Sequence, residues 1–224
     1  MDVVVDGEAG GPPRLQATVE APPGVTVLFG ASGAGKSTCL VTIAGLLRPS
    51  RGRIALGGEV LVDVARGIHL QPERRRVALV FQSLALFPHL TALENVGFGM
   101  PRARRRQERA AQAHHWLERM RVAHLAARRP ATFSGGEAQR VAIARALASE
   151  PRVLLLDEPF SAMDLPLRQE LGRELSALVE ELRLPTVLVT HDHDDARRLG
   201  ARMVVLSQGQ VVAQGRPAEV LAAS

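Results

Sequence analysis

A glycine-rich loop between an apolar run and a helical pattern constrains the fold more than any other feature of this chain. Residues 25–29 are mostly apolar and are bounded by glycines, as expected of a buried central strand, and residues 35–47 show a helical pattern. The loop between them fits G-x-x-x-x-G-K-[ST] and reads Gly30-Ala31-Ser32-Gly33-Ala34-Gly35-Lys36-Ser37. Strand, glycine loop and helix in this order predict an α/β domain whose loop surrounds phosphate oxygens with backbone N–H groups.

The lysine of this loop is unique in the chain. Of 28 basic residues, 27 are arginine and one is Lys36. Arginine carries a wide planar fork, whereas lysine carries a compact charge on a flexible stem, so a narrow loop closed around phosphates has room only for lysine. We therefore interpret residues 30–38, which end at Thr38, as a triphosphate-binding loop. Chance placement in an arginine-biased chain is the weaker interpretation.

A second apolar run ends in two carboxylates. Residues 153–156 are Val-Leu-Leu-Leu, and Asp157 and Glu158 follow them. The carboxyl ends of parallel strands form the ligand edge of such a sheet. We expect Ser37 and Asp157 to hold Mg²⁺ and Glu158 to act as the general base toward the attacking water. The alternative, in which the two carboxylates only cap a strand, loses weight beside a phosphate loop.

The order of patterns predicts an α/β fold: a P-loop NTPase core with a mainly parallel sheet, an N-terminal antiparallel β subdomain and an inserted α-helical subdomain. Strands are expected near residues 3–5, 15–19, 53–56, 60–62, 77–81, 153–156, 186–190 and 203–206. Arginine-rich helices are expected over residues 83–148, including 107–121, and another helix over 165–182. We expect one domain, with residues 1–82 and 149–224 as the core and 83–148 as the helical insert.

Composition excludes some classes of protein. Aromatic residues make up only 3% of the chain and tyrosine is absent, which argues against an aromatic platform for single-stranded nucleic acid. The net charge of +5 does not by itself choose among nucleic acid, lipid and phosphorylated ligands. The arginine runs at residues 74–76 and 104–106 are interpreted as solvated faces. The lone Cys39 is expected to be buried, in a protein of a reducing compartment. No signal peptide or membrane-spanning run is evident.

Further segments resemble the motifs of ATP-binding-cassette (ABC) ATPases. They are residues 132–140 for the signature, Gln82 for the Q-loop, residues 161–164 for the D-loop and residues 190–192 for the switch histidine. Together with the phosphate loop and the Asp157-Glu158 strand, they follow the order and spacing of that family. The resemblance extends from about Val25 to Ala222.

This resemblance implies ATP and Mg²⁺ as ligands and a homodimer as the working form. Gln82 would join Ser37 and Asp157 at the metal, and His191 would contact the γ-phosphate as a catalytic residue beside Glu158. In the family, the signature and D-loop act on ATP held by Lys36 of a second subunit. The residues with that role here are Ser134, Gly135, Gly136, Glu137 and Asp164.

Residues 51–99 resemble the ATPase subunits of oxyanion importers, those for molybdate most of all. Importers of sulfate, ferric iron, thiamine or polyamine are alternatives, and a soluble ABC ATPase without a transport role is a weaker one. In such importers the segment after the Q-loop glutamine meets the transmembrane permease, here near Phe87, Pro88 and Leu90. A periplasmic or extracellular binding protein would be an indirect partner, no nucleic acid is expected, and the subunit would lie peripherally on the cytoplasmic face of the membrane.

The chain departs from its expected group in two ways. Many of these importers carry a C-terminal regulatory domain, and none is expected after residue 224 here. The family usually stacks adenine on an aromatic residue before the phosphate loop, but no aromatic residue precedes Phe29. We expect Arg14 or Leu15 to cover the base instead, with less than about tenfold discrimination between ATP and GTP.

Overall fold

The computed structural model describes residues 2–7, 15–100, 105–161 and 163–222. The eleven strands of these residues form one continuous sheet in the order β6-β5-β4-β1-β2-β11-β10-β3-β9-β8-β7. One half is parallel and consists of β10 (Arg202–Ser207), β3 (Gly24–Phe29), β9 (Pro185–Thr190), β8 (Val153–Asp157) and β7 (Val77–Val80).

The other half of the sheet is antiparallel. It consists of β6 (Ile68–His69), β5 (Glu59–Asp63), β4 (Arg53–Leu56), β1 (Asp2–Gly7) and β2 (Leu15–Glu20). Strand β11 (Gln210–Gly215) joins the halves, because it runs antiparallel to β10 and meets β2 through the pair Gln210 and Gln16. The predicted fold class, with its antiparallel β part, parallel core and helical part, is confirmed.

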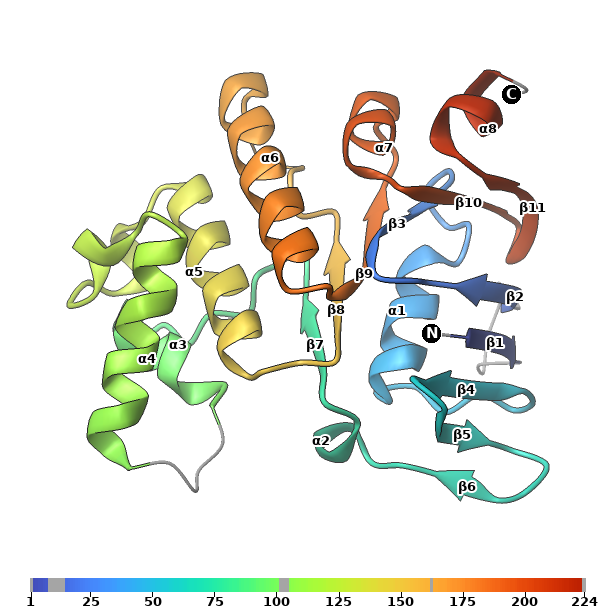
Figure 1. The fold of residues 1–224 in the computed structure, drawn as a ribbon, viewed down its shortest axis with the longest axis horizontal. Coiled ribbons are helices and arrows are strands. Elements are labelled where there is room, and N and C mark those ends of the chain that lie inside the picture. Colours follow the sequence, from blue (N-terminus) through green and yellow to red (C-terminus); the bar gives the residue numbers. More distant parts are fainter. Residues whose placement is uncertain (1, 8–14, 101–104, 162, 223–224) are drawn as a thin grey trace.

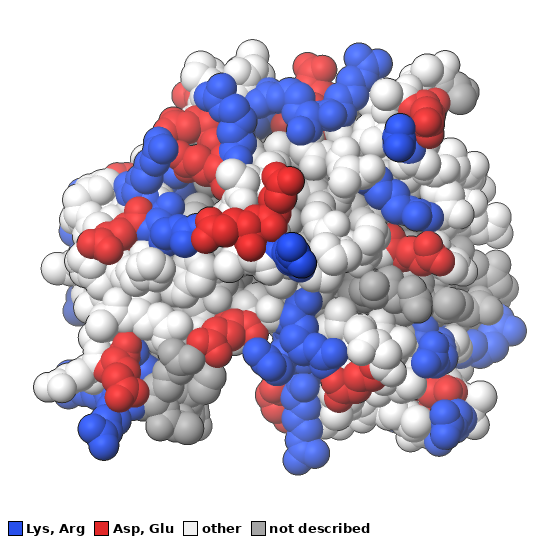
Figure 2. Space-filling model, in the orientation of Figure 1, with Lys and Arg blue, Asp and Glu red and all other residues white. Residues whose placement is uncertain are grey.

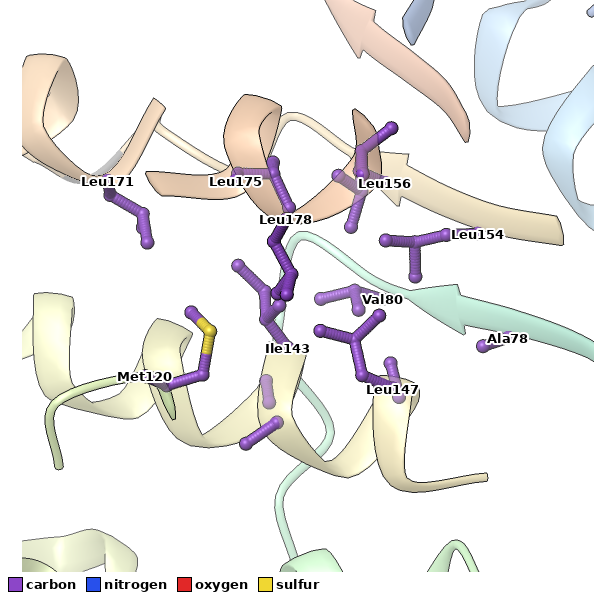
Figure 3. Close-up of a cluster of buried hydrophobic side chains, with 14 of the residues drawn as sticks. Ala78, Val80, Met120, Ile143, Leu147, Leu154, Leu156, Leu171, Leu175 and Leu178 are labelled. Carbon is purple, nitrogen blue, oxygen red and sulfur yellow. The ribbon is translucent and has the colours of Figure 1, made fainter. Parts of the chain in front are cut away.

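Strand β8 explains why the parallel strands are continuous apolar runs. Its side chains alternate between two cores: Val153 and Leu155 pack with helix α1 (Lys36–Ala44), whereas Leu154 and Leu156 pack on the opposite face. Figure 3 shows Leu154 and Leu156 facing Ile143 across this second core. A strand covered on both faces must be apolar at every position, not at alternate ones.

Helices α5 (Gly135–Ala148) and α6 (Leu165–Glu181) contribute about a third of the buried apolar side chains of that second core (Figure 3). Figure 1 shows α3 (Ala92–Phe98) and α4 (Arg106–Arg119) beyond α5, on the side away from the antiparallel strands. Two 3₁₀ turns, Ala123–Leu125 and Pro130–Thr132, link α4 to α5. The described part of residues 83–148 is thus helical and contains no strand, as predicted. The remaining helices are α2 (Pro72–Arg75), α7 (His193–Leu199) and α8 (Pro217–Ala222).

Three local features differ from the sequence expectations. Helix α1 ends at Ala44 and not at residue 47, because Gly45 adopts a left-handed conformation with φ of 88° and bonds back to Val41 and Thr42. Strand β11 was not predicted; its alternation of exposed and half-buried positions carries a weak apolar signal. The short strand β6 lies where no strand was expected, between Asp63 and Gln71.

The interpretation of residues 74–76 as a solvated face is wrong for Arg75. Arg74 and Arg76 are exposed, but Arg75 is fully buried. Its guanidinium donates hydrogen bonds to the carbonyls of Leu70, Thr42 and Ile43, and the last two lie at the end of α1. The charge thus supplies donors to carbonyls at a helix C-terminus, one of which, that of Thr42, also accepts the N–H of Gly45. On the face in Figure 2, acidic and basic side chains are interspersed.

Candidate active site

The register of the parallel strands brings the predicted active-site segments to one edge of the sheet. Phe29 pairs with Thr190, Asp157 with Val189, and Val80 with Leu156. The loops that follow β3, β9, β8 and β7 therefore start side by side. These loops carry the residues predicted for phosphate, metal and catalysis: Gly30 to Ser37, His191, Glu158 and Gln82.

Backbone geometry at the phosphate loop requires glycine. Gly30 has a φ of 151°, and a Cβ there would lie only 2.2 Å from the carbonyl oxygen of Leu206. Gly35 has a φ of 99°, and a Cβ there would lie 3.2 Å from Cδ1 of Leu15. Ala31, Ser32 and Gly33 are exposed at the tip of the loop. The loop is thus fixed at both ends and open at its tip.

Lys36 is buried within its own loop, with 6% of its surface exposed. Its Nζ donates to the carbonyls of Gly30 and Ala31, both at 2.8 Å. Helix α1, which Lys36 opens, has no side-chain cap and no acidic residue in its first turn. The N–H groups at the start of α1, from Lys36 through Ser37 and Thr38, therefore have no capping side chain of this chain to compete with an anion.

The predicted metal ligands Ser37 and Asp157 are in contact. The Ser37 hydroxyl donates to the Asp157 carboxylate at 3.1 Å. Burial raises the pKa of Asp157, with a further rise from the charge of Glu158, while the Ser37 bond and Lys36 act in the opposite direction. A hydroxyl and a half-buried carboxylate form the oxygen-rich, anionic pair that Mg²⁺ prefers. The residues present therefore fit this metal.

Glu158 lies between Gln82 and His191 at this edge of the sheet. Its carboxylate accepts a bond from the Gln82 amide at 3.3 Å and lies 3.2 Å from Nδ1 of His191. Its backbone has a φ of 47° and is fixed by its N–H to the Val189 carbonyl. The left-handed backbone turns the side chain out of the strand direction, toward the loops that carry its two partners. Gln82, expected at the metal, has its amide on Glu158 in this structure.

Sequence reasoning missed Arg168 on α6. Its guanidinium donates to the Asp192 carboxylate at 2.6 Å and to the Phe160 carbonyl at 3.3 Å. Asp192 follows His191 and Phe160 follows Glu158 by two residues, so Arg168 connects the loops that carry Glu158 and His191. The only sequence signal is a basic residue one turn after Asp164.

The predicted signature segment forms the start of α5. The Ser134 hydroxyl caps the helix by accepting from the N–H of Glu137 at 3.3 Å. The Glu137 carboxylate accepts from the Ser134 N–H at 2.7 Å and from its hydroxyl at 2.8 Å. The backbone bond from Ser134, then bonds from His124 and the Ser134 hydroxyl, lower the pKa of Glu137 to about 2.

Asp164 and the signature segment are neighbours. Asp164 caps α6 by accepting from the N–H of Leu167 at 3.0 Å. Leu167 in turn lies against Gly136, where an added Cβ would be 2.4 Å from its Cδ2. Gly135 is the first residue of α5. The chain therefore brings the signature and D-loop residues together as one group.

This second group is separate from the phosphate loop. Helix α1 packs on one face of the sheet and α5 packs on the other. In Figure 1 the two helices are separated by the strands of the parallel half. A single chain thus does not bring Ser134 to its own Lys36.

The segment after Gln82 borders a groove. Phe87 packs on Phe98 with ring centroids 4.4 Å apart, and the buried Asn95 bonds both the N–H and the carbonyl of Phe87. The groove beside it holds about 610 Å³ and is lined by apolar and basic side chains that include Leu90, Leu93, Phe98, Arg106, Arg109 and Ala110. Pro88 is exposed.

Leu15 does not cover a base as suggested from the sequence. Its side chain is 1% exposed and lies beneath the phosphate loop, in the core with Leu40. Arg14, the other candidate, lies outside the described residues. Within the described ranges, no helix combines the length and the apolar character needed to cross a bilayer.

Comparisons with known proteins agree with this geometry. Residues 16–161 match the family model described as ABC transporter. The chain is 44% identical over 209 residues to the molybdenum import ATP-binding protein ModC of Rhodospirillum rubrum, covering 93% of this chain and 56% of that protein. It is 45% identical over 206 residues to ModC of Brucella melitensis, covering 92% and 57%. The chain thus spans just over half the length of these relatives.

Solved structures share the whole fold. CbiO1 of Clostridium perfringens, part of the ABC transporter complex CbiONQ, has a TM-score of 0.84 at 30% identity and covers 98% of this chain and 89% of its own. The ATP-binding cassette MJ0796, solved as a dimer in a post-hydrolysis state with ADP and Pi, has a TM-score of 0.80 at 32% identity, with 96% of each chain covered.

Proposed function

Since this chain belongs to the ABC transporter family, we propose that it is the ATP-hydrolysing subunit of an importer that takes up a small oxyanion, molybdate. The observation that carries the activity is the hydrogen-bonded set Gln82, Glu158 and His191, which shares a sheet edge with the phosphate loop. The choice of cargo rests on the relatives named above. They are described as molybdenum import proteins, and this chain matches about 92% of its own length to them.

The phosphate loop binds ATP in this proposal. Lys36 leaves the carbonyls of Gly30 and Ala31 and bonds the β and γ phosphates, since a buried ammonium gains more from an anion than from neutral carbonyls. The N–H groups at the start of α1 hold the remaining phosphate oxygens. Mg²⁺, held by Ser37 and Asp157, would neutralise phosphate charge.

Glu158 accepts a proton from the attacking water. His191 and Gln82 orient its carboxylate from two sides, and Arg168 fixes the loops on which Glu158 and His191 lie. The side chain of His191 is 65% exposed, so it is accessible to the γ-phosphate of a nucleotide at this edge. The chain thus supplies a base and two residues that orient it.

The complete site needs a second copy of the chain. Within the group formed by Ser134, Gly135, Gly136, Glu137 and Asp164, the residues Ser134, Gly135 and Asp164 are exposed at helix N-termini, where a hydroxyl and N–H groups can bind an anion. Because Ser134 is separated from Lys36 within one chain, a two-fold dimer would complete two sites at once. MJ0796, which has this fold, has been solved as a dimer.

The groove beside Phe87 is proposed as the docking site for a transmembrane permease. A groove whose lining combines apolar side chains with Glu94, Arg106 and Arg109 suits a short amphipathic helix from a membrane subunit. Phe87, Pro88 and Leu90 would contact that helix. The chain would accordingly lie on the cytoplasmic face of the membrane, with a binding protein for the oxyanion acting on the far side through the permease. We keep residues 1–82 and 149–224 as the ATPase core and 83–148 as the helical subdomain in this proposal.

A reconstituted transporter tests the proposal. The chain is combined with its permease and binding protein in vesicles, and ATP hydrolysis is measured with molybdate, sulfate, ferric iron, thiamine or a polyamine. We expect molybdate to give the largest stimulation. Stimulation by another cargo would replace the oxyanion assignment, and binding to nucleic acid or ribosomes without transport would contradict the transport role.

The base assignment has its own test. Glu158→Gln keeps the bonds that a side-chain oxygen can accept but removes the proton acceptor. We expect ATP hydrolysis to fall by roughly 100-fold or more while ATP binding is kept, so that a nucleotide-bound dimer accumulates. Turnover near the wild-type rate would show that Glu158 is not the base.

A further inference from the structure

The capping box of α5 occupies the Ser134 hydroxyl, which the proposed function assigns to the triphosphate of a second subunit. The hydroxyl of Ser134 donates to the Glu137 carboxylate at 2.8 Å, and the same carboxylate takes the Ser134 N–H at 2.7 Å. In the proposed dimer, Ser134 donates to the triphosphate bound by the second copy. The isolated chain therefore holds this donor on a negative charge of its own.

The charges around Glu137 leave it one cationic partner. Nε2 of His124 lies 3.1 Å from Oε1 of Glu137. Arg121 and Arg140 line the same hollow of about 200 Å³, but both are engaged by acidic residues of α6. Arg121 lies 3.0 Å from Glu170 and 2.8 Å from Glu174, and Arg140 also pairs with these two. Across the described ranges, His124 is the only basic side chain in an ion pair with Glu137.

A carboxylate at this position opposes ATP. A phosphate oxygen that replaces Glu137 on the Ser134 hydroxyl would lie within a few ångströms of the carboxylate, and two like charges about 4 Å apart in water cost roughly fivefold in an equilibrium constant. Glutamine would keep the cap, because either Glu or Gln completes a capping box. The charge is therefore not needed for the helix to begin at Ser134.

We propose that the pair Glu137 and His124 sets the ATP concentration at which two copies of this chain close. Glu137 holds the Ser134 hydroxyl and repels the incoming triphosphate, and the imidazole of His124, in contact with the same carboxylate, reduces that repulsion. The inference rests on the proposed function, because it assumes that ATP joins two subunits through Ser134.

Measurement of dimer formation tests the role of Glu137. In the Glu158→Gln background, dimers are followed by light scattering as ATP and Mg²⁺ are added. A further Glu137→Gln change should lower the ATP concentration at half-maximal dimer by roughly fivefold. The affinity of the monomer for ATP, measured at low protein concentration, should be unchanged, because that nucleotide contacts the Lys36 loop and not α5.

Substitution of His124 tests its part in the same measurement of dimer formation. His124→Gln should raise the half-maximal ATP concentration when Glu137 is present and have no effect in the Glu137→Gln chain.

A matched control is the capping box of α3. Thr91 and Glu94 make the same three bonds as Ser134 and Glu137, at 2.8, 3.0 and 3.2 Å. Glu94→Gln should therefore leave the ATP concentration for dimer formation unchanged, with a melting temperature measured for each variant. The inference would be overturned, with the proposed function intact, by either of two results. One is an ATP concentration at half-maximal dimer that is unchanged or higher in Glu137→Gln. The other is an effect of His124→Gln that is equal in the chain with Glu137 and in the Glu137→Gln chain. Failure of the Glu158→Gln parent to dimerise with ATP would overturn the proposed function as well.

Discussion

Helices α1 and α5 both begin at residues that the proposed function places around ATP, yet their first turns are built in opposite ways. Helix α1 starts after Gly35 with no side-chain cap and no acidic residue in its first turn. Helix α5 starts after Ser134 with a complete capping box closed by Glu137. The first end leaves its N–H groups for a ligand of the same chain. The second end is satisfied until a second copy arrives.

The first turn of α1 is also more deeply buried than the first turn of α5. Lys36 is enclosed by its loop and the sheet, whereas Ser134 and Glu137 lie near the surface. A site that must bind nucleotide in the monomer is fixed by backbone and core. A site that must meet a partner is held by hydrogen bonds that can be exchanged. The predictions below test this difference.

The largest effect is expected for Lys36→Arg. The Nζ atom of the buried Lys36 bonds two carbonyls of its own loop at 2.8 Å, and the wider planar guanidinium of arginine does not match this compact ammonium. We expect ATP turnover to fall by roughly 100-fold or more, with a loss of ATP affinity measured by titration of the monomer. Arg74→Lys, an exposed exchange between the same residue types, is the control. Retention of turnover in Lys36→Arg would show that charge alone suffices.

Ser134→Arg should abolish turnover nearly as fully but by a different route. The bulky cation blocks the surface on which the second copy docks, so hydrolysis should fall by roughly 100-fold. Affinity of the monomer for ATP should stay within about twofold, because Ser134 lies on the opposite face of the sheet from α1. Equal loss of binding in Ser134→Arg and Lys36→Arg would break the distinction between the two ends.

Arg75→Met should reduce the free energy of unfolding by about 3 kcal/mol. This change leaves the carbonyls of Thr42, Ile43 and Leu70 buried without their charged donor. Urea denaturation measures the effect, and Arg74→Met, at an exposed neighbour, should cost less than about 0.5 kcal/mol. A comparably small loss in both variants would show that the far end of α1 needs no charged donor.

The smallest effect concerns acid stability. The pKa of Glu137 is lowered from 4.5 to about 2, so its contribution to stability is complete above 4.5 and is lost as pH falls toward 2. Glu137→Gln should remove this part of the pH dependence, seen as a flatter fall of melting temperature across that range. An unaltered acid profile would mean that the capping charge at α5 adds nothing measurable. The first turn of α1, with no acidic residue, has no corresponding contribution.

Much of the fold could be predicted, together with the placement of the candidate-site segments at one sheet edge, because the causes are local. A glycine loop that admits only lysine, and strands covered on both faces, leave direct marks in the sequence at residues 25–36 and 153–158. The ligand-edge positions of Gln82, Asp157 and His191 then follow from parallel register.

What could not be predicted depends on contacts between distant segments. Arg75 looks like its exposed neighbours in the sequence, and only the end of α1, more than 30 residues earlier in the chain, gives it a buried role. Arg168 likewise acquires its role from Asp192, 24 residues away. Leu15 was assigned to a base because the sequence does not reveal that the turn at Gly35 covers it.

The close approach of Gly136 to Leu167 has a mechanical consequence. Helices α5 and α6 touch at their first turns, so a displacement of one is transmitted to the other where Ser134 and Asp164 begin them. Leu167 is also the residue whose N–H Asp164 caps, so the contact and the cap share one residue. In the proposed dimer, a displacement of α5 relative to the second subunit would therefore carry Asp164 along with Ser134.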